Sequence, residues 1–394
     1  MKVTKTANEA FAEAMRQINP DVVSAYPITP ATEIVQIFSQ FVSDGLVKTE
    51  FVPVESEHSA MSACIGASAS GARTMTATSS QGLALMWEML YIASGLRLPI
   101  VMGVVNRALS APINIHCDHS DTFGARDCGW IQIYSENVQE TYDNLIQAVR
   151  IAEHPDVLLP VMVTTDGFIL SHCLETIEIL SDEEVQKFIG NLFERPNLLS
   201  SIHNKNPITI GAIDLQDYYF EHKRQQAEAM NRSLKVIPEI GKEFGKNYGR
   251  SYNFFEEYKL NDAEVGIVVI GSTAGTAKEV VDKIREKGEK VGLLKLRVFR
   301  PFPAEKIYQA LSHLKVIGVM DRGDGINAFS GPLYPEICCA LYDLPERPKI
   351  VNFIYGLGGR DIKVKDIEEI FYSLLKISKT GKKEFNLKYI GVRE

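Results

Sequence analysis

Apolar runs and helical patterns alternate along the first part of the chain. Unbroken apolar runs predict strands at 22–26, 49–54, 74–78, 99–105 and 158–164. Between these runs, apolar residues recur at helical spacing over 30–41, 56–71, 83–94 and 138–153. Apolar strands separated by helices are typical of a parallel sheet covered on both faces. We therefore expect residues 1–180 to form an α/β domain.

A second strand–helix series follows a more polar stretch that contains a charged helical pattern at 217–244. We expect the polar stretch, 181–258, to be a connecting arm, 259–378 a smaller α/β domain and 379–394 a polar tail. The second series predicts strands at 265–270, 291–296, 316–320 and 349–354, and helices at 276–287, 304–313, 332–342 and 363–375.

Composition and charge narrow the class of protein. Hydrophobic residues make up 45% and charged residues 23% of the chain, values that are ordinary for a globular protein. The net charge of -8 argues against a nucleic-acid partner and against a basic membrane anchor. Apolar runs stay below the about 18 residues that a membrane span needs. The N-terminal stretch lacks the apolar core of a signal peptide, so we expect a cytoplasmic protein.

The cysteines and one polar loop bear on metal binding. The chain has 6 cysteines, and no two of them form a C-x-x-C pair, so we expect neither an iron–sulfur cluster nor structural zinc in this chain. The loop at 116–121 holds several ligand types, but a metal needs three or four that converge. A solvated turn or the rim of a substrate site is the simpler interpretation, and no metal site is expected.

Ligands of parallel sheets bind beyond the carboxyl ends of the strands, so the residues that follow each strand are the candidates. Thr29 precedes Pro30 and is a suitable helix N-cap, where a hydroxyl could bind a carboxylate, although a plain capped helix start explains it as well. Glu55 and Glu57 point the same way if extended and diverge if a helix begins between them. They could complement a helix dipole or act in catalysis.

The later strands are followed by further candidates. The turn Ser79-Ser80-Gln81-Gly82 could direct N–H groups at a ligand, although it is weak evidence alone. Arg107 follows a fully apolar strand, where no structural need for it is evident, and its planar fork suits a carboxylate. For Asp166 and for the segment 321–325, which superficially resembles a metal–diphosphate motif, a turn is the simpler interpretation.

Taken together, these segments resemble the alpha subunits of the pyruvate:ferredoxin oxidoreductases (pyruvate synthases), within the 2-oxoacid:ferredoxin oxidoreductase family. The resemblance covers nearly the whole chain. It is carried by Tyr26-Pro27-Ile28-Thr29-Pro30, Glu55-Ser56-Glu57-His58, Thr78-Ser79-Ser80-Gln81-Gly82, Asn106-Arg107-Ala108-Leu109-Ser110, Gly129-Trp130-Ile131-Gln132, Arg300-Pro301-Phe302-Pro303 and Gly356-Leu357-Gly358-Gly359-Arg360-Asp361.

The resemblance implies a fold and an activity. The first domain would be the pyrimidine-binding type of thiamine diphosphate domain, and the second would be a transketolase C-terminal-like domain. The activity would be reversible oxidative decarboxylation of pyruvate with coenzyme A to acetyl-CoA and CO2, with electrons passed to ferredoxin. The chain would act only in a complex, in which a beta subunit shares the thiamine diphosphate. The partner beta, gamma and delta subunits would hold Mg²⁺ and the iron–sulfur clusters.

The resemblance also implies roles for particular residues. Glu57 would be the cofactor-activating glutamate, which hydrogen-bonds the pyrimidine ring and shares a proton with it. Thr29 and Arg107 would hold the substrate carboxylate. Ile28, Ser80 and Gln81 would be further cofactor contacts.

Three alternative functions are weighed against this interpretation. A branched-chain 2-oxoacid:ferredoxin oxidoreductase would use the same chemistry with a wider pocket. A noncatalytic scaffold subunit is disfavoured because Glu57, Arg107 and Thr29 are all present. A nicotinamide dehydrogenase is disfavoured because the chain lacks the glycine fingerprint of such enzymes.

Overall fold

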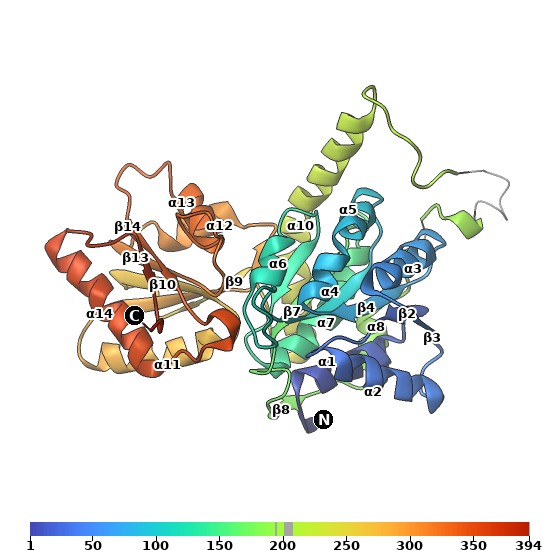
Figure 1. Ribbon diagram of the computed structural model, residues 1–394, viewed down its shortest axis with the longest axis horizontal. Coiled ribbons are helices and arrows are strands. Elements are labelled where there is room, and N and C mark those ends of the chain that lie inside the picture. The colour runs from blue at the N-terminus through green and yellow to red at the C-terminus, as the bar shows by residue number, and fades with distance from the viewer. Residues whose placement is uncertain (194, 201–207, 394) are drawn as a thin grey trace.

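The computed structural model describes residues 1–193, 195–200 and 208–393, which form two α/β bodies that lie side by side (Figure 1). The first body is built on a sheet of 7 strands in the order β12-β6-β7-β5-β4-β2-β3. The second is built on a sheet of 6 strands in the order β15-β14-β13-β10-β11-β9. Each sheet is parallel except for one edge strand, because β12 pairs antiparallel with β6 and β9 with β11. The expected α/β class is confirmed.

The first half of the chain supplies most of the first body. Its elements are β1 (Lys2–Lys5), α1 (Ala7–Ile18), β2 (Val22–Ala25), α2 (Thr32–Ser43), β3 (Glu50–Pro53), α3 (Glu57–Ala69), β4 (Thr74–Thr78), α4 (Ser80–Leu85), α5 (Trp87–Gly95), β5 (Val101–Asn106), α6 (Ser120–Gly124), β6 (Ile131–Tyr134), α7 (Val138–Glu153), β7 (Val161–Asp166), β8 (Glu175–Glu178) and α8 (Asp182–Ile189).

The second half supplies the long helix of the arm and the second body. Its elements are α10 (Tyr219–Tyr248), β9 (Phe255–Tyr258), β10 (Val265–Ile270), α11 (Thr273–Glu286), β11 (Val291–Leu296), β12 (Val298–Arg300), α12 (Ala304–Leu311), β13 (Val316–Asp321), α13 (Leu333–Ala340), β14 (Lys349–Ile354), the 3-10 turn η1 (Leu357–Gly359), α14 (Val364–Thr380) and β15 (Leu387–Tyr389).

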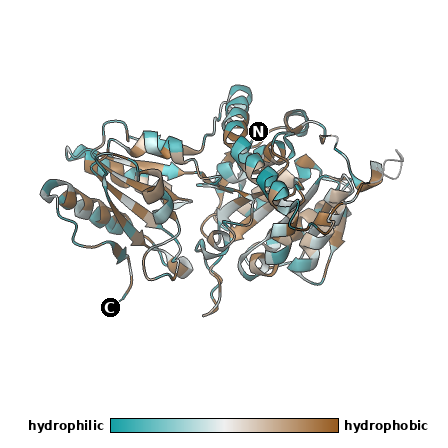
Figure 2. Cartoon of the chain, turned by 90° about the horizontal axis from the view of Figure 1, so that it is seen from above, coloured by the Kyte–Doolittle hydropathy of each residue, from teal (hydrophilic) through white to brown (hydrophobic). Residues whose placement is uncertain are grey.

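The apolar character of the central parallel strands follows from their burial on both faces. Every residue of β4, β5, β7, β10, β11 and β13 is buried, because helices cover both faces of each sheet. Hydrophobic residues accordingly concentrate in the strands and on the inner faces of the helices, while the outer faces are hydrophilic (Figure 2). The carboxyl ends of β2, β3, β4, β5 and β7 meet at one edge of the first sheet, since these strands are mutually parallel.

The arm does more than connect the two bodies. The later part of α10 packs into the first core through Ile237, Ile240 and Phe244. Its earlier part projects away from the body (Figure 1). β9, at the end of the expected arm, is an edge strand of the second sheet.

Three other segments differ from expectation. The helix predicted over 83–94 begins earlier and is divided into α4 and α5 at Met86. β12, from the second half of the chain, completes the first sheet. The expected polar tail contributes β15, which pairs in parallel with β14. The three boundaries between the four expected segments stay predictions, and residues 194, 201–207 and 394 lie outside the described chain.

Candidate functional site

Glu57 and Glu55 diverge at the start of α3. Ser56 is the N-cap of this helix and accepts a hydrogen bond from the backbone N–H of Ser59, so the helix begins between the two glutamates. Glu55 is exposed and accepts a hydrogen bond from the Ser59 hydroxyl at 2.5 Å. Glu57 is only 6% exposed. The two carboxylates are therefore in different environments, and only Glu57 is buried.

The Glu57 carboxylate has no hydrogen-bond or ion-pair partner among the residues that the structure describes. It lies against Gly82, where an added Cβ would be 2.6 Å from Glu57 Oε1 and 2.5 Å from Thr78 Oγ1. The Thr78 hydroxyl is buried and has no hydrogen-bond partner. Burying polar groups without partners is costly. The Glu57 carboxylate and the Thr78 hydroxyl, both without partners, thus lie together at Gly82, and we call this place the notch. Such groups suit a ligand that can donate a hydrogen bond.

Ser80 and Gln81 begin α4 beside this notch. Ser80 is fully buried and adopts a left-handed backbone conformation, with φ of 46°. Its hydroxyl lies 2.7 Å from both Gln81 Oε1 and the Ala108 carbonyl, and its single proton can be donated to only one of them at a time. Ile28, the other expected cofactor contact, is half-buried against the first core.

Arg107 is 8% exposed and follows the last residue of β5. Its guanidinium donates from Nε to the Asn114 carbonyl at 2.9 Å and from Nη1 to the Thr29 carbonyl at 3.0 Å. Within the described chain, no carboxylate pairs with it. A buried cation is normally paired with an anion, so this guanidinium is suited to an anionic ligand.

Thr29 is brought to Arg107 but is not a helix cap. The helix begins at Thr32, and its N-cap is Ala31, which provides no side-chain cap. The residue before a proline is disfavoured from helical geometry, and Thr29 lies in the turn that leads into the helix. Thr29 is exposed, its carbonyl holds Arg107, and its hydroxyl is left available. The expectation that Thr29 and Arg107 lie together is confirmed, while the N-cap interpretation is wrong.

Asp166 is not the simple turn expected from the sequence. It is a buried residue at the end of β7 whose carboxylate accepts hydrogen bonds from the Ser272 backbone at 3.0 Å and the Ser272 hydroxyl at 2.5 Å. The His119 ring lies 2.8 Å away and the Arg322 guanidinium 3.1 Å away. Burial alone would raise the pKa of Asp166, but His119 and Arg322 outweigh it and hold the pKa well below its usual value.

This carboxylate joins the two bodies, since Ser272 lies just beyond β10 and Arg322 directly follows β13, both strands of the second sheet. A second set of contacts lies nearby. Gly358 donates its N–H to Asp118 at 3.1 Å, and its carbonyl accepts from the Asn114 side chain at 3.0 Å. Because the Asn114 carbonyl also holds Arg107, the second body supports the loop that fixes the guanidinium.

Cys117, His119 and Asp166 place potential metal ligands within 4.8 Å of one another, and all three are buried. Both Asp166 oxygens already accept hydrogen bonds, and the Arg322 cation is adjacent. Burial raises the pKa of the Cys117 thiol well above its ordinary value, which disfavours the thiolate that binds metals. We therefore assign this cluster to the contact between the bodies.

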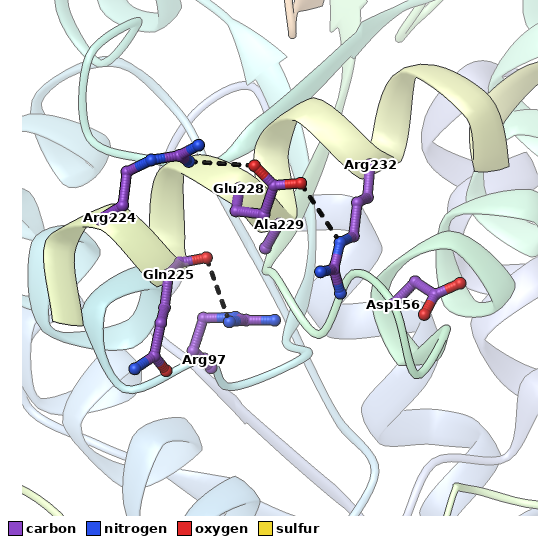
Figure 3. Close-up of a pocket in the computed structure, with 7 residues that line it drawn as sticks. All are labelled: Arg97, Asp156, Arg224, Gln225, Glu228, Ala229 and Arg232. Atoms are coloured by element: carbon purple, nitrogen blue, oxygen red, sulfur yellow. Dashed lines mark hydrogen bonds and ion pairs between the residues drawn. The ribbon is translucent and has the colours of Figure 1, made fainter. Parts of the chain in front are cut away.

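A hollow of about 510 Å³ lies elsewhere, beneath α10 (Figure 3). Glu228 lies between Arg224, at 3.0 Å, and Arg232, at 3.5 Å. Arg97 donates to backbone carbonyls, among them that of Gln225. Arg97 precedes β5 whereas Arg107 follows it, so this hollow is at the opposite edge of the sheet from the notch at Glu57.

The sequence did not single out several residues that build the site. Gly82 lies in one of the segments that carry the resemblance. Only the folded chain, however, shows that its missing side chain makes room for Glu57. Asn114 belongs to the segment after Arg107, yet its carbonyl contact needs the loop to fold back. Asp121 belongs to the loop for which the sequence favours a solvated turn or the rim of a substrate site, whereas it accepts hydrogen bonds from the backbones of both Ser80 and Arg107.

No helix in the described parts of the chain combines the length and apolar character needed to cross a membrane. Two family models match the chain. Residues 13–242 match the thiamine diphosphate-binding domain of pyruvate flavodoxin/ferredoxin oxidoreductases. Residues 263–367 match core domain II of pyruvate:ferredoxin oxidoreductases.

Known proteins match over the same span. Pyruvate synthase subunit PorA of Thermotoga maritima is 55% identical over 100% of this chain and 98% of its own length. Ketoisovalerate oxidoreductase subunit VorA of Pyrococcus abyssi is 42% identical over 97% of this chain and 95% of its own length. The 2-oxoglutarate:ferredoxin oxidoreductase of Magnetococcus marinus, whose structure holds 2-oxoglutarate, coenzyme A and succinyl-CoA, shares the fold, with a TM-score of 0.73 at 20% identity. That match covers 95% of this chain and 65% of the other.

The identity to a pyruvate synthase subunit exceeds that to the ketoisovalerate subunit, as the expectation of pyruvate requires. With both halves matched by family models and its full length matched by a subunit of known type, the chain belongs to the PorA family, the alpha subunits of CoA-acylating pyruvate:ferredoxin oxidoreductases.

Proposed function

We propose that the notch at Glu57 and Gly82 receives the pyrimidine ring of thiamine diphosphate. The observation that carries this proposal is the buried Glu57 carboxylate, which has no partner in the described chain. A pyrimidine nitrogen that shares a proton with it would satisfy the carboxylate. The absence of a side chain at Gly82 makes room for the Glu57 side chain itself and so fixes where the carboxylate lies.

When bound, thiamine diphosphate would supply the carbon nucleophile for the 2-oxoacid and would accept the electron pair that stays behind when CO2 leaves. Glu57 holds a proton at the pyrimidine ring and so sets its protonation state. Ser80 and Gln81 border the ring through the start of α4, and Ile28 supplies an apolar contact. This chain therefore orients one half of the cofactor.

Arg107 binds the carboxylate of the substrate in this proposal. Two of its nitrogens are fixed by the carbonyls of Thr29 and Asn114, so the guanidinium is held in place before the substrate arrives. An oriented guanidinium places the 2-oxo carbon relative to the cofactor, which lowers the entropic part of the barrier. The Thr29 hydroxyl is available as a second contact to the same carboxylate.

We assign the diphosphate and its Mg²⁺ to a partner beta subunit. The motif-like segment 321–325 has two acidic residues, of which Asp324 accepts a hydrogen bond from the Tyr389 hydroxyl. Asp321, the first of the two, is buried and accepts hydrogen bonds from the backbone of Leu333 and the side chain of Asn352. Those contacts cap the start of α13 and leave Asp321 poorly placed to bind a cation. The iron–sulfur clusters and the contacts to coenzyme A and ferredoxin are assigned to partner gamma and delta subunits, and the complex to the cytoplasm.

Replacement of Glu57 by Gln in the assembled complex tests the proposal. The amide keeps the shape of the side chain but cannot share the proton, so pyruvate-dependent ferredoxin reduction should fall at least about a hundredfold. Glu55→Gln is the matched control, because Glu55 is exposed and close in sequence, and it should retain activity. Near-normal turnover in the Glu57 variant would remove the proposed role.

A comparison of substrates separates the remaining alternatives. The purified complex should turn over pyruvate with a higher kcat/KM than 2-oxoisovalerate. The reverse order would identify a branched-chain enzyme. A complex without turnover of either acid, in which bound cofactor does not contact this chain, would identify a scaffold subunit.

A further inference from the structure

Asp121 lies in the short helix α6, at the end of the loop that begins with Arg107. It is 4% exposed and follows His119 and Ser120, close to the contact between the two bodies. The sequence favours a solvated turn or the rim of a substrate site for this loop, yet both carboxylate oxygens of Asp121 are buried acceptors. Each is directed at N–H groups of the first body.

The carboxylate accepts four hydrogen bonds. Oδ1 accepts from the Asn106 side chain at 2.9 Å and from the Thr122 backbone at 2.7 Å. Oδ2 accepts from the backbone of Ser80 at 3.1 Å and from that of Arg107 at 3.0 Å. Burial raises the pKa of Asp121 to about 6, so the group is mainly ionised at neutral pH.

The two backbone donors on Oδ2 belong to different parts of the proposed site. Ser80 begins the segment that borders the cofactor, and Arg107 binds the substrate. Their strands, β4 and β5, are neighbours in the sheet, but both residues lie beyond the last ladder pair, Thr78 with Val104. The sheet therefore does not fix their spacing. The Ser79 and Ser80 hydroxyls contact the carbonyls of Val105 and Ala108, and Asp121 Oδ2 is the group that accepts from the backbone N–H groups of both Ser80 and Arg107.

We propose that Asp121 is a positioning residue that sets the cofactor segment at Ser80 and the substrate segment at Arg107 relative to each other. This inference rests on the proposed function and adds a residue that touches neither ligand. An asparagine cannot replace it, because its amide offers one acceptor oxygen and turns an NH2 group toward donors. At least one pair of N–H groups would then be left buried without an acceptor.

The test compares Asp121→Asn with Asp143→Asn in the assembled complex. Asp143 is the matched control, because it is also a buried aspartate in the first body and accepts hydrogen bonds from Arg250 and Tyr252, which lie outside the proposed site. Three quantities are measured for each variant: the melting temperature, the KM for pyruvate, and the thiamine diphosphate concentration that half-restores activity to the cofactor-free complex.

Asp121→Asn should raise the KM for pyruvate about tenfold. It should also raise, by about tenfold, the thiamine diphosphate concentration that half-restores activity, since small displacements of binding groups have large effects. Asp143→Asn should lower the melting temperature without changing either constant. If Asp121→Asn lowers only the melting temperature, or changes only one of the two constants, the inference is overturned.

A second variant covers the case in which Asp121→Asn does not assemble. Asn106→Ala removes the donor to Oδ1 while the aspartate stays, and it should raise both constants together by about threefold. Unchanged constants in Asn106→Ala would overturn the inference. Glu57→Gln and Arg107→Ala, measured in the same series, distinguish a failure of the proposed function from a failure of the inference about Asp121. If these two lose activity while Asp121→Asn behaves as wild type, the proposed function stands and the inference fails. If Glu57→Gln and Arg107→Ala both keep activity, the proposed function fails and the inference fails with it.

Discussion

Gly82 offers a direct way to move the Glu57 carboxylate without altering its chemistry. In Gly82→Ala the new Cβ would lie 2.6 Å from Glu57 Oε1, whereas ordinary contacts begin at 3.4 Å. The carboxylate must therefore retreat by about 0.8 Å, and the Thr78 hydroxyl, 2.5 Å from the same point, must move as well. A misplacement of about 1 Å can lower a rate by about a hundredfold.

The effect on stability should be small by comparison. Overpacking costs about 1–3 kcal/mol, while alanine in place of glycine within a helix gains up to about 1 kcal/mol. The net loss should be no more than about 3 kcal/mol, so the variant should fold and assemble while pyruvate-dependent ferredoxin reduction falls by about ten- to a hundredfold. The assay is steady-state reduction of ferredoxin by the complex, together with a melting curve.

Gly66→Ala is the matched control for this change. Gly66 lies in α3, the helix that begins with Glu57, and an added Cβ there meets nothing within 4 Å. This variant should gain up to about 1 kcal/mol and keep full activity. Full activity in Gly82→Ala would refute the reasoning, because it would show that the position of the Glu57 carboxylate does not limit turnover.

Three further predictions concern other charged groups. Arg107→Lys should lower kcat/KM for pyruvate about ten- to a hundredfold, because lysine lacks the planar fork, and an unchanged value would contradict the role. The depressed pKa of Asp166 means that its charged form stabilises the fold. This contribution is complete above about pH 4 and is lost as the pH falls through the folded-state pKa. The free energies of unfolding of Asp166→Asn and wild type, measured in urea, should therefore converge only under acid conditions. Lys295 is buried between Glu136, at 2.8 Å, and Glu140, at 2.5 Å, so Lys295→Met should cost about 3–5 kcal/mol in a urea unfolding experiment, and a loss below about 1 kcal/mol would contradict it.

The apolar strands were predictable because the local sequence alone indicates that they are buried. The expected strands at 74–78, 265–270, 291–296 and 349–354 and the helix at 138–153 agree with the structure at both ends. In each case a continuous apolar run, or a regular helical pattern, decides the structure without help from distant residues. The elements that were missed depend on distant partners. β12 and β15 are only 3 residues long and become strands because β6 and β14 present free edges to them.

The same distinction applies to the candidate site: features set by the local sequence were predictable, and features that depend on distant residues were not. A buried Glu57 distinct from an exposed Glu55 follows from where the helix begins, which the sequence presents as one of two outcomes. The meeting of Arg107 with Thr29 follows from the rule for parallel sheets. The roles of Asp166 and Arg322 could not be predicted, because their pairing joins two bodies whose relative placement is absent from local patterns. The four acceptor contacts of Asp121 likewise require the loop to fold back on its own start.

The central claim is that Glu57 and Arg107 hold the cofactor ring and the substrate at one edge of the first sheet. The most direct measurement is a structure of the assembled complex with thiamine diphosphate and pyruvate. We predict the pyrimidine ring within hydrogen-bond distance of the Glu57 carboxylate and the pyruvate carboxylate on the Arg107 guanidinium. A cofactor ring that contacts neither Glu57 nor the segment at Ser80, or a substrate carboxylate held away from Arg107, would contradict the claim.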